Sequence, residues 1–355
     1  MKHLIRFISA FLILLSLFCF SACKNKSGVL EFTEFNTLIH IETHDKAMST
    51  QTEQSIRTLF SELDNEFDAN STDSFVYRLN NSKSGITVQL GQTAIEVLSL
   101  AQNYVEYTDG KFNPAVYPLV KLWGFAPFNM TVAFTPPTDE QIQAVKTSVD
   151  FSAIKLDQEK QNVTKSKDDV QIELGGMLKG YACDKAAEIL KKAGHVSGYI
   201  NVGGSSLHIL ATESLGIKNP RSNGTALSVN LKEKNNLPVS TSGDYERYYE
   251  YDGKRFSHVI DASTGSPSQT GISGATLIGG GGAFGDALTT ALCLSAYTPN
   301  DLNSPLVLLM KKITTDYKDC SLFVFYDGEV RQLITNKKQG IDFTLHDDGY
   351  TVVNI

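Results

Sequence analysis

Two neighbouring stretches decide how this chain is interpreted: STSGDYERYY at residues 240–249 and SHVIDASTGSP at residues 257–267. They bring together hydroxyls, glycines, carboxylates, aromatic rings and a histidine, His258. A core built from such residues would be unstable, because an unpaired buried polar group costs about 1–3 kcal/mol. The composition therefore predicts a site that holds a phosphate-bearing aromatic ligand.

His258 lies between Ser257 and the apolar pair Val259 and Ile260, with Asp261 close behind. An imidazole beside a carboxylate can act as a general base near neutral pH. A histidine in a strand can equally be structural, and the residues alone leave both interpretations open.

Two glycine-rich turns offer backbone to a ligand. In ELGGMLKGY, residues 173–181, glycines precede a predicted helix start. The free N–H groups of that start can face an anion, and Lys179 would add a point charge from the first helical turn. The second turn, NVGGSS at 201–206, allows close approach of a ligand. Either turn can instead be purely structural.

Asp286 and Thr290 are four residues apart on a predicted helix and so share one face. A carboxylate and a hydroxyl there are suitable ligands for Mg²⁺. The alternative is that Asp286 caps the helix and Thr290 merely packs. Trp123 and Phe125 could likewise stack on an isoalloxazine or adenine ring, or belong to the core.

The N-terminus reads as an export signal. Lys2 and Arg6 precede an apolar run over 7–20, which is too short to span a bilayer comfortably. The run ends at FSAC, residues 20–23, which resembles a bacterial lipobox. We expect a lipoprotein signal peptide at 1–22, a lipidated Cys23 with a tether over 23–30, and one domain over 31–355. An ordinary secretory peptide is the alternative.

The formal net charge is −7, and removal of residues 1–22 would take away Lys2 and Arg6 and no acidic residue. An acidic chain argues against general nucleic-acid binding. Cys183, Cys293 and Cys320 have no metal-like spacing and predict buried small hydrophobic residues. A disulfide between two of them is possible in an exported protein.

Hydrophobic periodicity predicts strands mixed with helices in no regular order. This pattern favours an α+β fold, a single domain with mixed or antiparallel sheets flanked by helices. The predicted helices cover 48–67, 93–107, 179–193 and 284–296; the predicted strands cover 35–43, 197–210, 225–231, 275–278 and 350–355, with a hairpin at 321–334.

Several segments, in their order along the chain, resemble those of the ApbE family of FAD:protein FMN transferases. They are 109–113, 118–125, 173–184, 201–205, 240–249, 257–267 and 285–291. The resemblance implies an ApbE-like (T-fold-like) architecture and a role for each of the following residues. Mg²⁺ would be held by the Gly176 carbonyl, Asp286 and Thr290; FAD by Lys111, Phe112, Asn113, Glu173, Lys179 and Ile260; and His258 would be the catalytic base.

The same resemblance implies that FMN passes from FAD to a threonine or serine hydroxyl, with release of AMP. The expected acceptors are flavoprotein subunits of membrane redox complexes or exported flavoproteins. The expected location is the periplasmic face of the inner membrane, with the lipid as anchor. Two alternatives remain: a Mg²⁺-dependent FAD pyrophosphatase that gives FMN and AMP, and a lipid-anchored flavin carrier.

Overall fold

The computed structural model describes residues 27–129, 131, 133–232, 234–336 and 341–355. The predicted signal peptide and Cys23 lie outside the described residues. The first strand, β1, begins at Gly28, and Leu30 is buried. Residues 28–30 of the predicted tether therefore belong to the fold.

A nine-stranded sheet forms the centre of the molecule, and its spatial order follows the chain: β1-β2-β6-β7-β10-β15-β16-β17-β19. Its pairs are antiparallel except that β17 and β19 are parallel. The bounds are β1 Gly28–Glu34, β2 Thr37–Thr43, β6 Gly198–Val202, β7 Ser206–Ala211, β10 Asn235–Gly243, β15 Ile272–Ile278, β16 Ser321–Asp327, β17 Arg331–Thr335 and β19 Thr351–Asn354.

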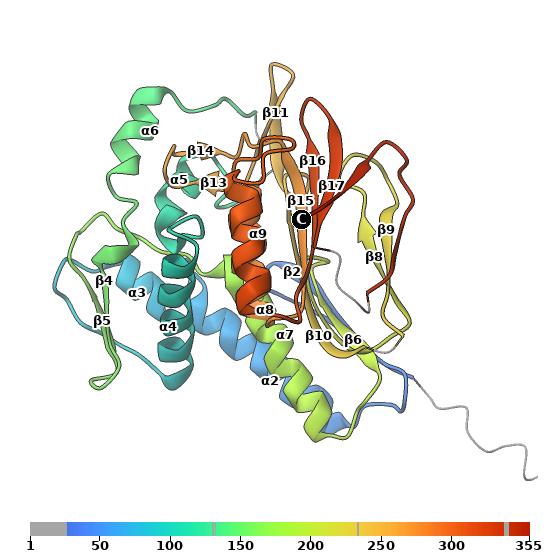
Figure 1. The fold of residues 1–355 in the computed structure, drawn as a ribbon. Coiled ribbons are helices and arrows are strands. Elements are labelled where there is room, and N and C mark those ends of the chain that lie inside the picture. Colours follow the sequence, from blue (N-terminus) through green and yellow to red (C-terminus); the bar gives the residue numbers. More distant parts are fainter. Residues whose placement is uncertain (1–26, 130, 132, 233, 337–340) are drawn as a thin grey trace, which may run out of the picture.

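Both faces of this sheet are covered, by different partners. In β16, Leu322 and Val324 pack in the helical core, whereas Phe323 and Phe325 pack in a second core under a small sheet. Successive side chains of a strand point to opposite faces, so one apolar strand supplies both cores. The small sheet has the order β18-β9-β8, with bounds Phe343–Leu345, Thr225–Asn230 and Ser214–Lys218. Figure 1 shows the helices on one side of the large sheet and β8 and β9 on the other.

The helical layer contains α7 and α8 against the sheet, with α2, α4 and α9 around them. The periodicity predicted α2 and α4 to within two residues, but α7 begins at Gly175, four residues earlier than expected. Lys179 is therefore the fifth residue of α7 and not part of a first turn. The helix bounds are α2 Thr50–Phe67, α3 Phe75–Asn81, α4 Gln92–Tyr107, α5 Tyr117–Leu122, α6 Asp139–Lys146, α7 Gly175–Lys192, α8 Gly282–Cys293 and α9 Pro305–Asp316.

A third apolar cluster lies beside the helical layer and is built around Trp123, Phe125 and Tyr249. It joins α5 and α6 to the hairpin β11–β12, which projects from the top of the molecule in Figure 1. The remaining short elements are β3 Val88–Gln89, β4 Ile154–Asp157, β5 Asn162–Lys165, β11 Tyr248–Tyr251, β12 Lys254–Ser257, β13 Ile260–Asp261, β14 Ser266–Pro267, η1 Pro114–Val116 and η2 Phe151–Ala153.

The predicted α+β class with one mixed sheet and flanking helices is confirmed. The hairpin expected at 321–334 forms as β16 and β17, and Thr351–Asn354 joins the sheet as expected. Within the part of the chain that the structure describes, none of the helices combines the length and the apolar character needed to cross a bilayer.

Candidate active site

Two buried glycines bring α7 and α8 into backbone contact. A Cβ atom on Gly180 would lie 2.1 Å from the Gly282 carbonyl oxygen, and one on Gly282 would lie 2.2 Å from the Gly180 oxygen. Only glycine fits at such a crossing. The Asp184 carboxylate accepts a 2.6 Å hydrogen bond from the Gly282 N–H and so caps α8. This contact fixes where the polar residues of α8 lie.

Asp286, the fifth residue of α8, is buried against α7 and β7. Its carboxylate accepts hydrogen bonds from the Gly180 N–H at 2.7 Å and from Ser206 Oγ at 2.8 Å. Burial raises its pKa to about 6, against the opposing effect of the Lys179 charge and these hydrogen bonds. Asp286 does not cap α8, so that alternative is wrong; Asp184 does.

Thr290 lies one turn beyond Asp286 on the same helix. Its Oγ1 donates to the Asp286 carbonyl at 3.1 Å and lies 3.3 Å from Ser242 Oγ on β10. In a regular helix the Gly180 N–H would donate only to the Gly176 carbonyl. Here it donates to the Asp286 carboxylate at 2.7 Å. Asp286 therefore contacts α7 one turn beyond Gly176, and Thr290 lies one turn further along α8.

This donor set fits a hard cation. It consists of oxygen atoms only, and no described lysine, arginine or histidine nitrogen forms an ion pair with the buried Asp286 carboxylate. Among the described residues there is no cluster of three or more His, Cys, Asp or Glu side chains able to hold a metal. A metal here would thus be held by one carboxylate, a hydroxyl and a carbonyl, with water completing its coordination.

The turn before α7 is closed by Glu173. Its Oε1 accepts a 2.9 Å hydrogen bond from the Gly175 N–H, and a Cβ on Gly175 would lie 2.2 Å from that oxygen. Burial raises the pKa of Glu173, and the Gly175 N–H, Lys179 and Arg247 oppose the shift. Both cations therefore lie near this carboxylate.

The segment 109–113 packs against the same turn. Phe112 is buried, and its ring would lie 3.3 Å from a Cβ on Gly176. Lys111 Nζ lies 3.4 Å from Asp261 Oδ2, which ties the segment to β13. Asn113 Oδ1 accepts from the Ala115 N–H and caps η1, so the Asn113 side chain has a structural bond of its own.

His258 follows β12 and is held by the turn after β10. Its backbone N–H donates to the Arg247 carbonyl at 3.0 Å, and its Nδ1 lies 3.2 Å from the same oxygen. A carbonyl oxygen can only accept, so Nδ1 carries the proton and Nε2 keeps its lone pair. Burial, together with the charges of Arg247 and Lys179, lowers the pKa of His258 to about 4. The imidazole is therefore neutral at neutral pH and able to accept a proton.

Asp261 is not the partner of His258 that the sequence suggested. Its Oδ1 accepts from the backbone and side chain of Ser263 at 2.7 and 2.6 Å, and its Oδ2 faces Lys111. Burial opposes ionisation, but these hydrogen bonds and the Lys111 charge lower the pKa of Asp261 overall. The carboxylate thus orders the 261–263 turn and not the imidazole.

Trp123 and Phe125 are core residues. Trp123 is 3% exposed, donates from Nε1 to the Gly265 carbonyl at 2.8 Å and stacks on Phe256. Ile260 is buried in the same cluster. The three cysteines are buried, as expected of small hydrophobic residues, and no disulfide joins them. The sequence interpretation that Trp123 stacks directly on a ligand receives no support.

Four of the expected site residues lie on the two helices that meet at the α7–α8 contact: Gly176 and Lys179 on α7, and Asp286 and Thr290 on α8. The charge of Lys179 affects the pKa values of Asp286, Glu173 and His258. Sequence reasoning missed Arg247, whose carbonyl orients His258 and whose exposed side chain acts on both His258 and Glu173. Its only signal was its position inside the 240–249 stretch. Ser206, which contacts Asp286, was marked only as part of a glycine-rich turn.

Comparison with known proteins agrees with this geometry. The model of the ApbE family matches residues 35–299. An FAD:protein FMN transferase of Haemophilus influenzae is 28% identical over 307 residues, which cover 82% of this chain and 87% of the relative. One of Escherichia coli is 30% identical over 256 residues, which cover 70% and 72%.

Solved structures agree as well. The crystal structure of the ApbE protein of Thermotoga maritima matches with a TM-score of 0.74 at 25% identity, covering 86% of this chain and 96% of that one. The flavin transferase ApbE of Vibrio cholerae matches with a TM-score of 0.73 at 19% identity, covering 90% and 97%, and supports the fold. The chain therefore belongs to the ApbE family.

Proposed function

We propose that this enzyme, an FAD:protein FMN transferase, binds Mg²⁺ through Asp286, Thr290 and the Gly176 carbonyl and uses His258 as general base. The observation that carries the proposal is geometric: the buried Asp286 carboxylate lies one helical turn from Thr290 and forms no ion pair with a described side chain, and the Arg247 carbonyl orients the His258 imidazole. A bound Mg²⁺ would neutralise charge on the diphosphate and help to position the phosphorus.

Different residues of the site would bind different parts of FAD. Lys179 and the N–H groups at the start of α7 supply positive potential for the diphosphate. Phe112 and Ile260 supply apolar surface beside it, and Lys111 is positioned by Asp261. Glu173 shapes the turn that presents Gly176.

In the transfer itself, the acceptor hydroxyl oxygen forms a bond to the FMN phosphorus while the bond from that phosphorus to the bridging oxygen breaks. The hydroxyl proton passes to Nε2 of His258, and AMP leaves with the bridging oxygen. The Nδ1–H bond to the Arg247 carbonyl holds the imidazole in the tautomer that this step needs. A water in place of the hydroxyl would give FMN and AMP, which is the pyrophosphatase alternative.

The test uses the purified protein with FAD, Mg²⁺ and a flavin-free acceptor subunit of a membrane redox complex. We expect flavin fluorescence on the acceptor band after denaturing electrophoresis and AMP release in equal amount. Release of FMN and AMP with no labelled acceptor would instead mark a pyrophosphatase, and unchanged FAD would mark a carrier. A parallel Asp286→Ala reaction should be inactive with a native far-UV spectrum.

We also propose that the protein is a lipoprotein anchored at Cys23 on the periplasmic face of the inner membrane. The basic start, the short apolar run and the sequence FSAC support this location. Mass spectrometry of the mature N-terminus should find an acylated Cys23. An unmodified residue 23, or cleavage elsewhere, would contradict the proposal.

A further inference from the structure

A polar ring ties the small sheet to the end of the large sheet. We use this name for Asn219, Arg221, Asp327, Arg331 and Asp347. Arg221 Nε lies 3.0 Å from Asp327 Oδ2, and Arg331 bridges Asp327 at 3.1 Å to Asp347 at 3.0 Å. Asn219 closes the ring, because its Nδ2 donates to Asp347 at 2.7 Å and its Oδ1 accepts from the Arg221 N–H at 2.9 Å.

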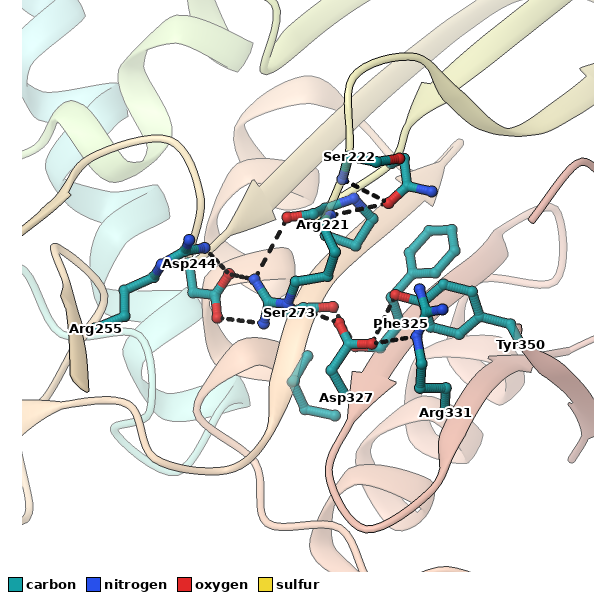
Figure 2. Close-up of polar contacts among 12 residues, drawn as sticks. Arg221, Ser222, Asp244, Arg255, Ser273, Phe325, Asp327, Arg331 and Tyr350 are labelled. Atoms are coloured by element: carbon teal, nitrogen blue, oxygen red, sulfur yellow. Dashed lines mark hydrogen bonds and ion pairs between the residues drawn. The ribbon is translucent and has the colours of Figure 1, made fainter. Parts of the chain in front are cut away.

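Arg221 also reaches out of this ring. Its two terminal nitrogens each lie 2.7 Å from one oxygen of Asp244, which makes a bidentate pair (Figure 2). On the other side of Asp244, Arg255 of β12 approaches Oδ1 at 3.8 Å. The Asp244 N–H donates to the Ser273 carbonyl at 3.1 Å. Asp244 is therefore held from three directions.

Asp244 lies in the middle of the segment that touches both halves of the active site. Two residues before it, Ser242 Oγ lies 3.3 Å from Thr290 Oγ1, beside the metal ligands. Three residues after it, the Arg247 carbonyl binds His258. The spacing between Thr290 and His258 thus depends on the conformation of residues 242–247.

We propose that Arg221 is a positioning residue for the transfer reaction: its fork to Asp244 fixes the segment 242–247 and so sets His258 against Thr290. The proposal rests on the function proposed above for these two residues. Partly exposed ion pairs add little to the stability of a protein, whereas a bidentate pair in a network fixes geometry.

The test compares Arg221→Gln, Arg221→Lys and Asp244→Asn with Arg331→Gln, which breaks the far side of the ring and leaves the fork intact. All are assayed well below their melting temperatures. We expect the first three to lower kcat for FMN transfer by roughly tenfold or more, since small misplacements are costly in catalysis. KM for FAD should change by less than about threefold. Arg221→Lys should not restore activity, because lysine cannot form the fork.

Two further measurements make the outcome decisive. The double variant Arg221→Gln/Asp244→Asn should be no slower than either single variant, because both remove one interaction. Hydrogen exchange of the 242–249 amides should speed up in Arg221→Gln but not in Arg331→Gln. Wild-type kcat and unchanged exchange in Arg221→Gln would overturn the proposal. An active His258→Ala would instead overturn the base assignment and leave the exchange result standing.

Discussion

Gly180→Ala tests how closely the metal site depends on the α7–α8 contact. The new Cβ would lie 2.1 Å from the Gly282 oxygen, 2.3 Å from its carbonyl carbon and 2.9 Å from the Ala283 nitrogen. Cβ atoms essentially never approach closer than 3.0 Å, so the helices must separate by about 0.9 Å. That shift would stretch the 2.7 Å bond from the Gly180 N–H to Asp286 out of hydrogen-bonding range.

The expected cost has two parts. Overpacking costs about 1–3 kcal/mol, and a lost hydrogen bond to a charged group costs about 1.5–3 kcal/mol. For a domain of this size the melting temperature should fall on the order of 5–10 °C. Because Asp286 also moves relative to Gly176 and Thr290, the apparent affinity for Mg²⁺ should fall by roughly tenfold or more.

The assay is a Mg²⁺ titration by calorimetry, with thermal melts of the same samples. Gly216→Ala is the matched control: its Cβ would meet only Thr225, with a nearest distance of 3.3 Å, and Gly216 lies on β8 away from the site. Gly180→Ala protein that is folded at the assay temperature and binds Mg²⁺ as tightly as the wild type would refute the reasoning.

Two other variants test the site, and a third tests the buried Lys165 of β5. Asp286→Ala should abolish Mg²⁺-dependent turnover in a protein with a native spectrum; wild-type turnover would falsify the metal assignment. His258 has a folded pKa of about 4 against an ordinary 6.5, so its contribution to stability is lost as pH falls from 6.5 to 4. His258→Gln should therefore reduce the acid destabilisation in urea melts by about 1–2 kcal/mol; an acid destabilisation equal to that of the wild type contradicts the lowered pKa. Lys165→Met should cost about 3 kcal/mol or more in chemical denaturation, because three carbonyls bound by the buried Nζ at 2.9–3.0 Å would lose their partner; a change under about 1 kcal/mol would show that water replaces it.

Local patterns in the sequence predicted local structure well. The apolar spacing of 48–67 predicted α2, and Thr138 caps α6 through a hydrogen bond from the N–H of Gln141, three residues later. The four-residue spacing of Asp286 and Thr290 also placed both on one face of α8. These features depend on residues within a turn or two of one another, so periodicity and capping rules suffice for them.

Contacts between distant segments of the chain could not be predicted from the sequence. His258 and Asp261 are neighbours in sequence, yet the imidazole binds Arg247 and the carboxylate binds Ser263 and Lys111. His258 lies in the bend after β12 whereas Asp261 lies in β13, so proximity in sequence does not imply contact. Nothing in the sequence indicated that Arg221 and Asp244 form a pair, because Arg221 follows β8 of the small sheet and Asp244 follows β10 of the large sheet. The metal site could be predicted only from the resemblance to the ApbE family, because an aspartate near the start of a helix can also serve as its cap.

The order of strands in the large sheet bears on how this chain can assemble. Each strand of the sheet pairs with the strand that precedes it in the sheet and in the chain, so the sheet can grow from β1 toward β19 as segments become available. The helices and the small sheets interrupt this growth as excursions, at 44–197 after β2, 212–234 after β7, 244–271 after β10, 279–320 after β15 and 336–350 after β17. Lys179, His258 and Asp286 each come from a different excursion. The polypeptide can therefore acquire its scaffold progressively from its N-terminal side, while the active site is completed only when the excursion after β15, which carries α8, has docked.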